Sequence, residues 1–155
     1  MGGFAWYEFT PTLGPQEESL RKATRALLVT LEDIREGHAE SPTVLLGFSQ
    51  GALMALVAST ARLPNVKGVA ALSGYLPKDD LLPGPLASLR GFPVFQTHAR
   101  NDFMLPFVFA EGARDRLIKA GADLTWIEHE SGHTIPLDAM DRLGTWLERV
   151  ANLAP

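Results

Sequence analysis

The chain has 155 residues, a length typical of a single domain. It is 46% hydrophobic and 21% charged, and interspersed charges sum to −4 at pH 7, which favours a packed core and argues against disorder or a nucleic-acid partner. The absence of cysteine excludes disulfides, a cysteine nucleophile and a cysteine-based metal site. No secretory signal or long apolar run is evident, so we expect a cytoplasmic protein without stable membrane insertion.

The first elements in chain order are a helix, a buried strand and a second helix. Residues 15–37 predict a helix, because Pro15 lies near an acidic first turn and apolar residues recur at helical spacing. The continuous apolar run at 43–48 is typical of a strand buried on both faces of a parallel sheet. Residues 50–61 follow at once and predict a buried helix.

Strands and helices continue to alternate along the rest of the chain. We expect strands at 66–72, 93–98 and 123–129, helices at 106–120 and 136–150, and mostly loop at 77–93. This alternation indicates the α/β class, with one domain over residues 1–155. The predicted sheet is mostly parallel, with about four or five strands and with helices on both faces.

A nucleophile motif lies where the strand 43–48 meets the helix 50–61. The sequence GFSQG, residues 47–51, fits the pattern G-x-S-x-G. In such an elbow the chain turns sharply from strand to helix, the serine is exposed at the turn, and flanking glycines allow close backbone approach. We therefore predict that Ser49 is a nucleophile and that the main-chain N–H of Gln50 stabilises an oxyanion.

A serine hydroxyl is a poor nucleophile near neutral pH, so it needs a base, and the base needs an acid that orients it. With this kind of elbow, the acid and then the base follow the serine along the chain. Asp102 follows the strand 93–98 and His133 follows the strand 123–129, so both should reach the same sheet edge as Ser49. His98 and His129, at strand ends, are expected to support loops. No two histidines share a helix at ligand spacing, so we expect no metal.

Several segments together are similar to one known family: GFSQGALMAL (47–56), ALSGYLP (71–77), VFQTHARNDFMLP (94–106), SGHTIPLDAMDRLGTWL (131–147) and GGFAWYEF (2–9). They resemble the carboxylesterase/phospholipase family of α/β-hydrolases, which includes the acyl-protein thioesterases. The resemblance implies a shortened α/β-hydrolase fold and hydrolysis of esters or thioesters without a cofactor. It also implies Ser49 as nucleophile, Asp102 as orienting acid and His133 as base.

The chain departs from this family's pattern ahead of the elbow. Family members carry further early strands and a loop that supplies a second oxyanion N–H, and no such segment precedes Ser49 here. Ala99 also stands where the family often has glycine. The strand 43–48 should therefore form an apolar sheet edge. We expect a homodimer through this strand, a covering strand from Phe4–Thr10, or a longer natural protein.

The loops around Ser49 are expected to form an apolar binding site for an uncharged acyl group. The predicted substrate-binding residues are Tyr75, Leu76, Phe103, Met104 and Ile135. The predicted function is a serine esterase acting on small-molecule carboxylic esters with short-to-medium acyl groups. Alternatives are a thioesterase, lysophospholipase or peptidase, or a catalytically weak hydrolase remnant that serves as a binding module.

Overall fold

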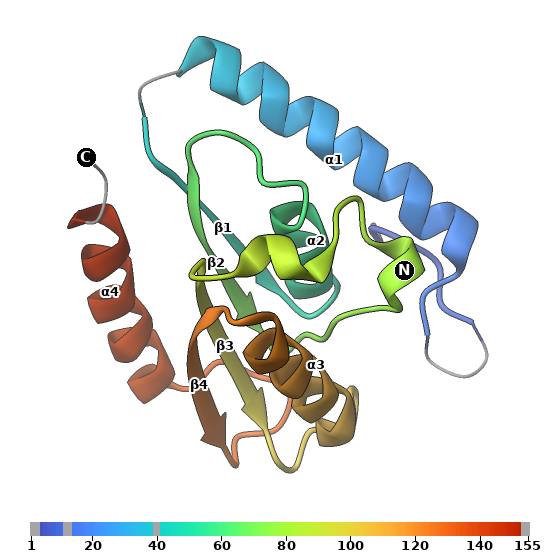
Figure 1. The fold of residues 1–155 in the computed structure, drawn as a ribbon. Helices are drawn as coiled ribbons and strands as arrows, with labels where there is room; N and C mark the ends of the chain where they lie inside the picture. The colour runs from blue at the N-terminus through green and yellow to red at the C-terminus, as the bar shows by residue number, and fades with distance from the viewer. Residues whose placement is uncertain (1–3, 11–13, 39–40, 153–155) are drawn as a thin grey trace.

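A four-stranded parallel sheet forms the centre of the protein (Figure 1). The computed structural model describes residues 4–10, 14–38 and 41–152. The strands are β1 (Thr43–Phe48), β2 (Val66–Leu72), β3 (Pro93–Ala99) and β4 (Asp123–His129), and they lie in the order β1-β2-β3-β4. All three strand pairings are parallel, which confirms the predicted fold class.

Helices connect the strands within a residue or two of the predicted boundaries. They are α1 (Glu17–Gly37), α2 (Gln50–Ser59), α3 (Phe107–Ala120) and α4 (Leu137–Asn152). The segment 77–93, predicted to be mostly loop, also contains two short 3₁₀ helices, η1 (Asp79–Leu81) and η2 (Leu86–Leu89). No helix in the described part of the chain is long and apolar enough to cross a membrane.

Helices cover both faces of the sheet, as predicted. One face packs against α2 and α3, and α1 packs in turn against α2, whose apolar side chains are buried almost completely. The other face packs against α4, where Trp146 lies 5.8 Å, centroid to centroid, from the ring of Phe95. Figure 1 shows α4 on the side of the sheet opposite α2 and α3. This burial is the main stabilising contribution to the fold.

The edge strand β1 leaves apolar surface in contact with solvent. Among the described residues β1 pairs only with β2, and Leu46 and Phe48 are 54% and 38% exposed. An open groove of about 510 Å³ runs along β1 between α1 and α2. The expected covering strand from Phe4–Thr10 is wrong, because Phe9 instead forms an antiparallel bridge with Pro15. Association of two chains through β1 stays a prediction.

Candidate active site

Ser49 occupies the turn between β1 and α2 in an unusual backbone conformation. Its φ of 55° and ψ of −119° are rare for a residue with a side chain. The Ser49 N–H donates to the carbonyl of Leu72 on β2, over 2.9 Å, which fixes the turn to the sheet. Such strain persists only where neighbouring contacts enforce it, and it is concentrated at functional sites.

The tightness of this turn explains the glycine two residues before Ser49. A Cβ atom at Gly47 would lie 2.0 Å from the carbonyl oxygen of Gly51 in the first turn of α2. No side chain fits at that distance, so only glycine allows β1 to run directly into α2. The turn therefore places Ser49 at the N-terminus of α2, where main-chain N–H groups lack partners within the helix and favour negative charge.

Asp102 is presented by the loop that follows β3. Its Oδ1 atom accepts hydrogen bonds from the main-chain N–H groups of Met104, at 2.9 Å, and Leu105, at 2.8 Å. These bonds leave Oδ2 directed at His133, whose Nδ1 atom lies 2.7 Å away. The carboxyl group is buried away from water, and protein donors satisfy both of its oxygens, as buried polar groups require.

His133 lies in the loop after β4 and bridges Asp102 and Ser49. Its Nε2 atom is 3.0 Å from the Oγ atom of Ser49. Asn101 holds this loop, since its Oδ1 accepts from the Gly132 N–H and its Nδ2 donates to the Glu130 carbonyl, each over 2.8 Å. The ring of Phe48 supports the imidazole at a centroid distance of 4.9 Å.

The electrostatics of Asp102 determine which nitrogen of His133 carries the hydrogen. Burial by itself would raise the pKa of the Asp102 carboxyl, but hydrogen bonds from His133 and the Leu105 N–H outweigh it and hold that pKa below its usual value. The carboxylate is ionised and can only accept, so Nδ1 of His133 is the donor. Nε2 is then free to accept the hydroxyl proton of Ser49.

His98 supports the Asp102 loop from within the core, as expected from its place at a strand end. Its Nε2 donates to the Leu105 carbonyl over 2.8 Å and lies 3.5 Å from Oδ2 of Asp102. Burial lowers the pKa of His98, which favours the neutral ring. His129 likewise supports its loop, because its Nδ1 accepts from the Ser131 N–H over 3.2 Å.

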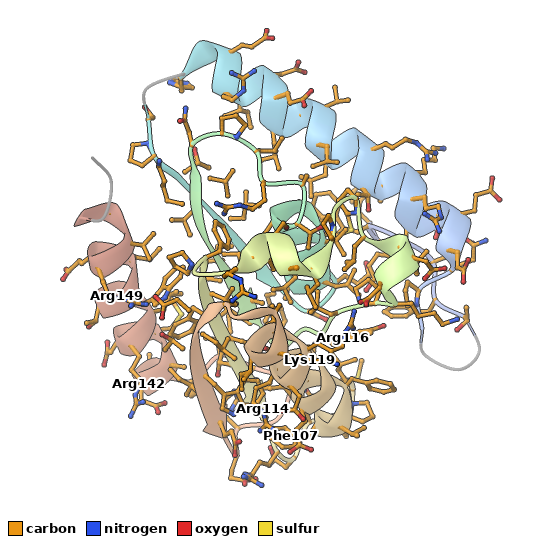
Figure 2. The ribbon with its side chains drawn as sticks, in the orientation of Figure 1. Phe107, Arg114, Arg116, Lys119, Arg142 and Arg149 are labelled. Carbon is orange, nitrogen blue, oxygen red and sulfur yellow. The ribbon has the colours of Figure 1, made fainter. Side chains whose placement is uncertain are left out.

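A cavity of about 270 Å³ opens beside Ser49. Its lining is mainly apolar and aromatic, and consists of Tyr7, Phe9, Ser49, Gln50, Tyr75, Met104, Leu105 and His133. None of the cations labelled in Figure 2 belongs to this lining, since they lie on α3 and α4: Arg114, Arg116, Lys119, Arg142 and Arg149. The cavity therefore suits an uncharged, apolar group.

The structure places only two of the five predicted substrate-binding residues, Tyr75 and Met104, in this lining. Leu76 is instead buried in the core, and Ile135 packs with the cluster on the α4 face. Phe103 is 83% exposed and lies outside the lining. A position on a loop near Ser49 was therefore not enough to predict that a side chain lines the cavity, because the local backbone conformation decides which side chains turn toward Ser49.

Two lining residues, Tyr7 and Phe9, were not predicted as part of the site. They belong to a segment distant in sequence from the other site residues, and the side chain of Gln50 holds this segment. The one sequence feature that could have indicated their role is the aromatic sequence WYEF at residues 6–9. No group of three or more potential ligand side chains that could hold a metal occurs in the described ranges.

A half-buried serine at a strand-to-helix elbow, hydrogen-bonded to a histidine that an aspartate orients, defines the serine hydrolase class of site. The family model for Phospholipase/Carboxylesterase matches residues 1–151. The chain belongs to the phospholipase/carboxylesterase family of α/β-hydrolases.

Individual relatives agree with this assignment. The chain is 26% identical to acyl-protein thioesterase 1 of Yarrowia lipolytica over 137 residues, which cover 86% of this chain and 60% of that protein. The chain therefore spans less than two thirds of that curated relative. Among solved structures, esterase PE8 has a TM-score of 0.80 at 29% identity, with 96% of this chain and 71% of PE8 covered.

The carboxylesterase of Bacillus cereus has the same fold, with a TM-score of 0.79 at 22% identity over 93% of this chain and 68% of that structure. Acyl-protein thioesterase 2 of Zea mays superposes with a TM-score of 0.74 at 18% identity, over 95% of this chain and 72% of that structure.

Proposed function

We propose that the chain is a serine esterase that hydrolyses carboxylic esters with short-to-medium acyl groups. The observation that carries this proposal is the continuous hydrogen-bonded arrangement Ser49–His133–Asp102, with distances of 3.0 Å and 2.7 Å. Family membership supports the reaction class, because esterases and thioesterases occur among the similar proteins.

Acylation begins when the hydroxyl proton of Ser49 passes to Nε2 of His133 and Oγ attacks the ester carbonyl carbon. The resulting oxyanion receives the main-chain N–H of Gln50, with the N-terminus of α2 beneath it. His133 then gives its proton to the departing alcohol as the carbon–oxygen bond breaks. Asp102 keeps Nδ1 of His133 protonated and stabilises the imidazolium.

Deacylation repeats this chemistry with water as the nucleophile. His133 takes a proton from water, the hydroxide adds to the acyl carbonyl, and Ser49 recovers its proton as the acid leaves. We assign only one oxyanion donor, the Gln50 N–H. Removal of one oxyanion donor typically lowers kcat by roughly 10²–10³, so we expect the Gln50 N–H to contribute to the rate on that scale.

The size and lining of the cavity support the choice of substrate. At about 270 Å³ it lies just below the range of about 300–1,000 Å³ that is usual for small-molecule sites. Tyr75, Met104 and Leu105 offer apolar contacts, and His133 is the only lining side chain that can carry a cationic charge. A short or medium acyl chain fits these surroundings better than a charged or bulky group.

The proposal is tested by hydrolysis of p-nitrophenyl butyrate by this chain beside its Ser49→Ala variant. We expect a rate above background that falls to background in the variant. Exposed Ser131→Ala, in the loop after β4, is a matched serine control that should retain the activity. Equal rates for the parent chain and Ser49→Ala would contradict the proposal and favour a non-catalytic binding role.

Thioesters are the second candidate substrate. The curated relative from Yarrowia lipolytica is an acyl-protein thioesterase, and the same acyl-enzyme would form from a thioester. Comparing kcat/KM for p-nitrophenyl butyrate and butyryl-coenzyme A distinguishes the two, since the acyl group is identical and only the leaving group differs.

A further inference from the structure

The side chain of Gln50 joins the nucleophile elbow to the beginning of the described chain. Its Oε1 atom accepts a hydrogen bond from the Trp6 N–H at 2.9 Å, and its Nε2 atom donates to the Tyr7 carbonyl at 3.0 Å. One amide thus satisfies two adjacent main-chain groups that lie more than forty positions away in sequence. Because the amide offers both a donor and an acceptor, this pairing fixes the orientation of the main chain.

The same segment is also fixed to the start of α1. We define residues 6–10 as the N-terminal strap. The Glu8 N–H donates to Oγ of Ser19 over 3.0 Å, and the Glu8 carbonyl accepts from the Gln16 N–H over 2.7 Å. The Thr10 N–H donates to the Gly14 carbonyl over 2.7 Å. The strap is therefore held at one end by α2 and at the other by α1.

Between these two attachments the strap supplies one wall of the acyl cavity. Tyr7 is 3% exposed, and its ring meets that of Phe9 at a centroid distance of 5.5 Å; both line the cavity with Ser49. The indole of Trp6 lies beside Gly51, where a Cβ would be 3.7 Å from Nε1 of Trp6, an ordinary van der Waals distance. The position of this wall relative to Ser49 therefore depends on the Gln50 amide.

We propose that the Gln50 side chain is a positioning residue that sets acyl-chain selectivity by fixing the N-terminal strap against the nucleophile elbow. This inference rests on the proposed esterase function. It differs from the role of the Gln50 main chain, whose N–H serves the oxyanion and is retained in every variant at position 50 except proline. Loss of the side chain frees the Tyr7–Phe9 wall and enlarges the space available to the acyl group.

Two variants at position 50 separate these roles. Gln50→Ala removes both hydrogen bonds to the strap, whereas Gln50→Glu keeps the acceptor for the Trp6 N–H and loses the donor to the Tyr7 carbonyl. In Gln50→Ala we expect KM for p-nitrophenyl butyrate to rise by about tenfold, with a smaller fall in kcat. The ratio of kcat/KM for octanoate to that for butyrate should rise, and Gln50→Glu should lie between the parent and Gln50→Ala.

Phe9→Ala alters the same wall without cutting the amide bonds, so it should shift the chain-length ratio in the same direction. If Gln50 acts through the strap, the effects of Gln50→Ala and Phe9→Ala on this ratio should be less than additive in the double variant. An unchanged ratio in Gln50→Ala, or a fall confined to kcat, would overturn the inference.

Hydrogen–deuterium exchange tests the strap without relying on catalysis. In Gln50→Ala we expect faster exchange in peptides that cover residues 4–10, while peptides from β2 and β3 keep the parent's protection. Unchanged exchange at 4–10 would overturn the inference. A parent chain that hydrolyses no ester but shows this exchange difference would instead contradict the proposed function and leave the strap's attachment by Gln50 established.

Discussion

The Nδ1 atom of His133 lies 2.7 Å from Oδ2 of Asp102, across 31 positions of the chain. Asp102→Asn would present an amide there and favour the tautomer that cannot accept the Ser49 proton. We expect kcat for p-nitrophenyl butyrate to fall by about 10³–10⁴. Exposed Asp33→Asn on α1 is the matched control. A fall of less than tenfold in Asp102→Asn would contradict the orienting role.

Gly47→Ala tests the elbow geometry. The new methyl group would lie 2.0 Å from the Gly51 carbonyl oxygen, so α2 must shift. We expect the free energy of unfolding to fall by about 3 kcal/mol or more, together with loss of activity. Gly112→Ala is the control, because nothing lies within 4 Å of its Cβ site on α3, and it should stabilise by about 0.5–1 kcal/mol. If denaturant titration gave Gly47→Ala the same free energy of unfolding as the parent chain, this description of the turn would be wrong.

Stability should fall as the pH drops from 7.5 to 5.5. Burial lowers the native pKa values of His98 and His129, so the unfolded chain binds more protons as the pH falls through about 6.5. This contribution to the free energy of unfolding is fully present above the histidine pKa of the unfolded chain. As the pH falls below that pKa, the free energy of unfolding decreases by up to about 1.4 kcal/mol per pH unit for each histidine.

His98→Gln should reduce this pH dependence, because it removes one of these groups while a side-chain amide remains to donate to the Leu105 carbonyl. Denaturant titrations at both pH values measure the difference. His38→Gln, at the exposed end of α1, is the matched control. The same pH dependence in His98→Gln and the parent would show that His98 does not contribute.

The exposed edge of β1 predicts concentration-dependent self-association. Leu46 is 54% exposed on a strand whose sequence, TVLLGF, carries no charge. Such an edge is a template for pairing with another strand, and an added lysine opposes it. Light scattering after size exclusion should show association that weakens in Leu46→Lys. A monodisperse monomer at every concentration would refute the predicted homodimer.

The strands and helices were predictable because each carries a local signal. The apolar run before GFSQG indicated β1, and the order serine, aspartate, histidine followed the order of the strands. Parallel strands bring their carboxyl ends to one edge, so topology alone placed Ser49, Asp102 and His133 near one another.

The cavity wall was not predictable in the same way. The strap is held beside Ser49 by the Gln50 side-chain amide, which accepts from the Trp6 N–H and donates to the Tyr7 carbonyl, and such a contact leaves no periodic pattern in the sequence. Leu76 and Ile135 follow strands near the site, yet turn into opposite cores. Side-chain direction in these loops depends on backbone angles that residue type does not determine.

Covalent labelling by diisopropyl fluorophosphate, followed by intact-mass and peptide mass spectrometry, tests whether Ser49 is a nucleophile activated by His133. We predict one adduct per chain, on Ser49, which is absent in Ser49→Ala and forms much more slowly in His133→Ala, because the imidazole takes the hydroxyl proton. An unlabelled parent chain, or labelling at the same rate without His133, would contradict the assignment of Ser49 as a nucleophile activated by His133.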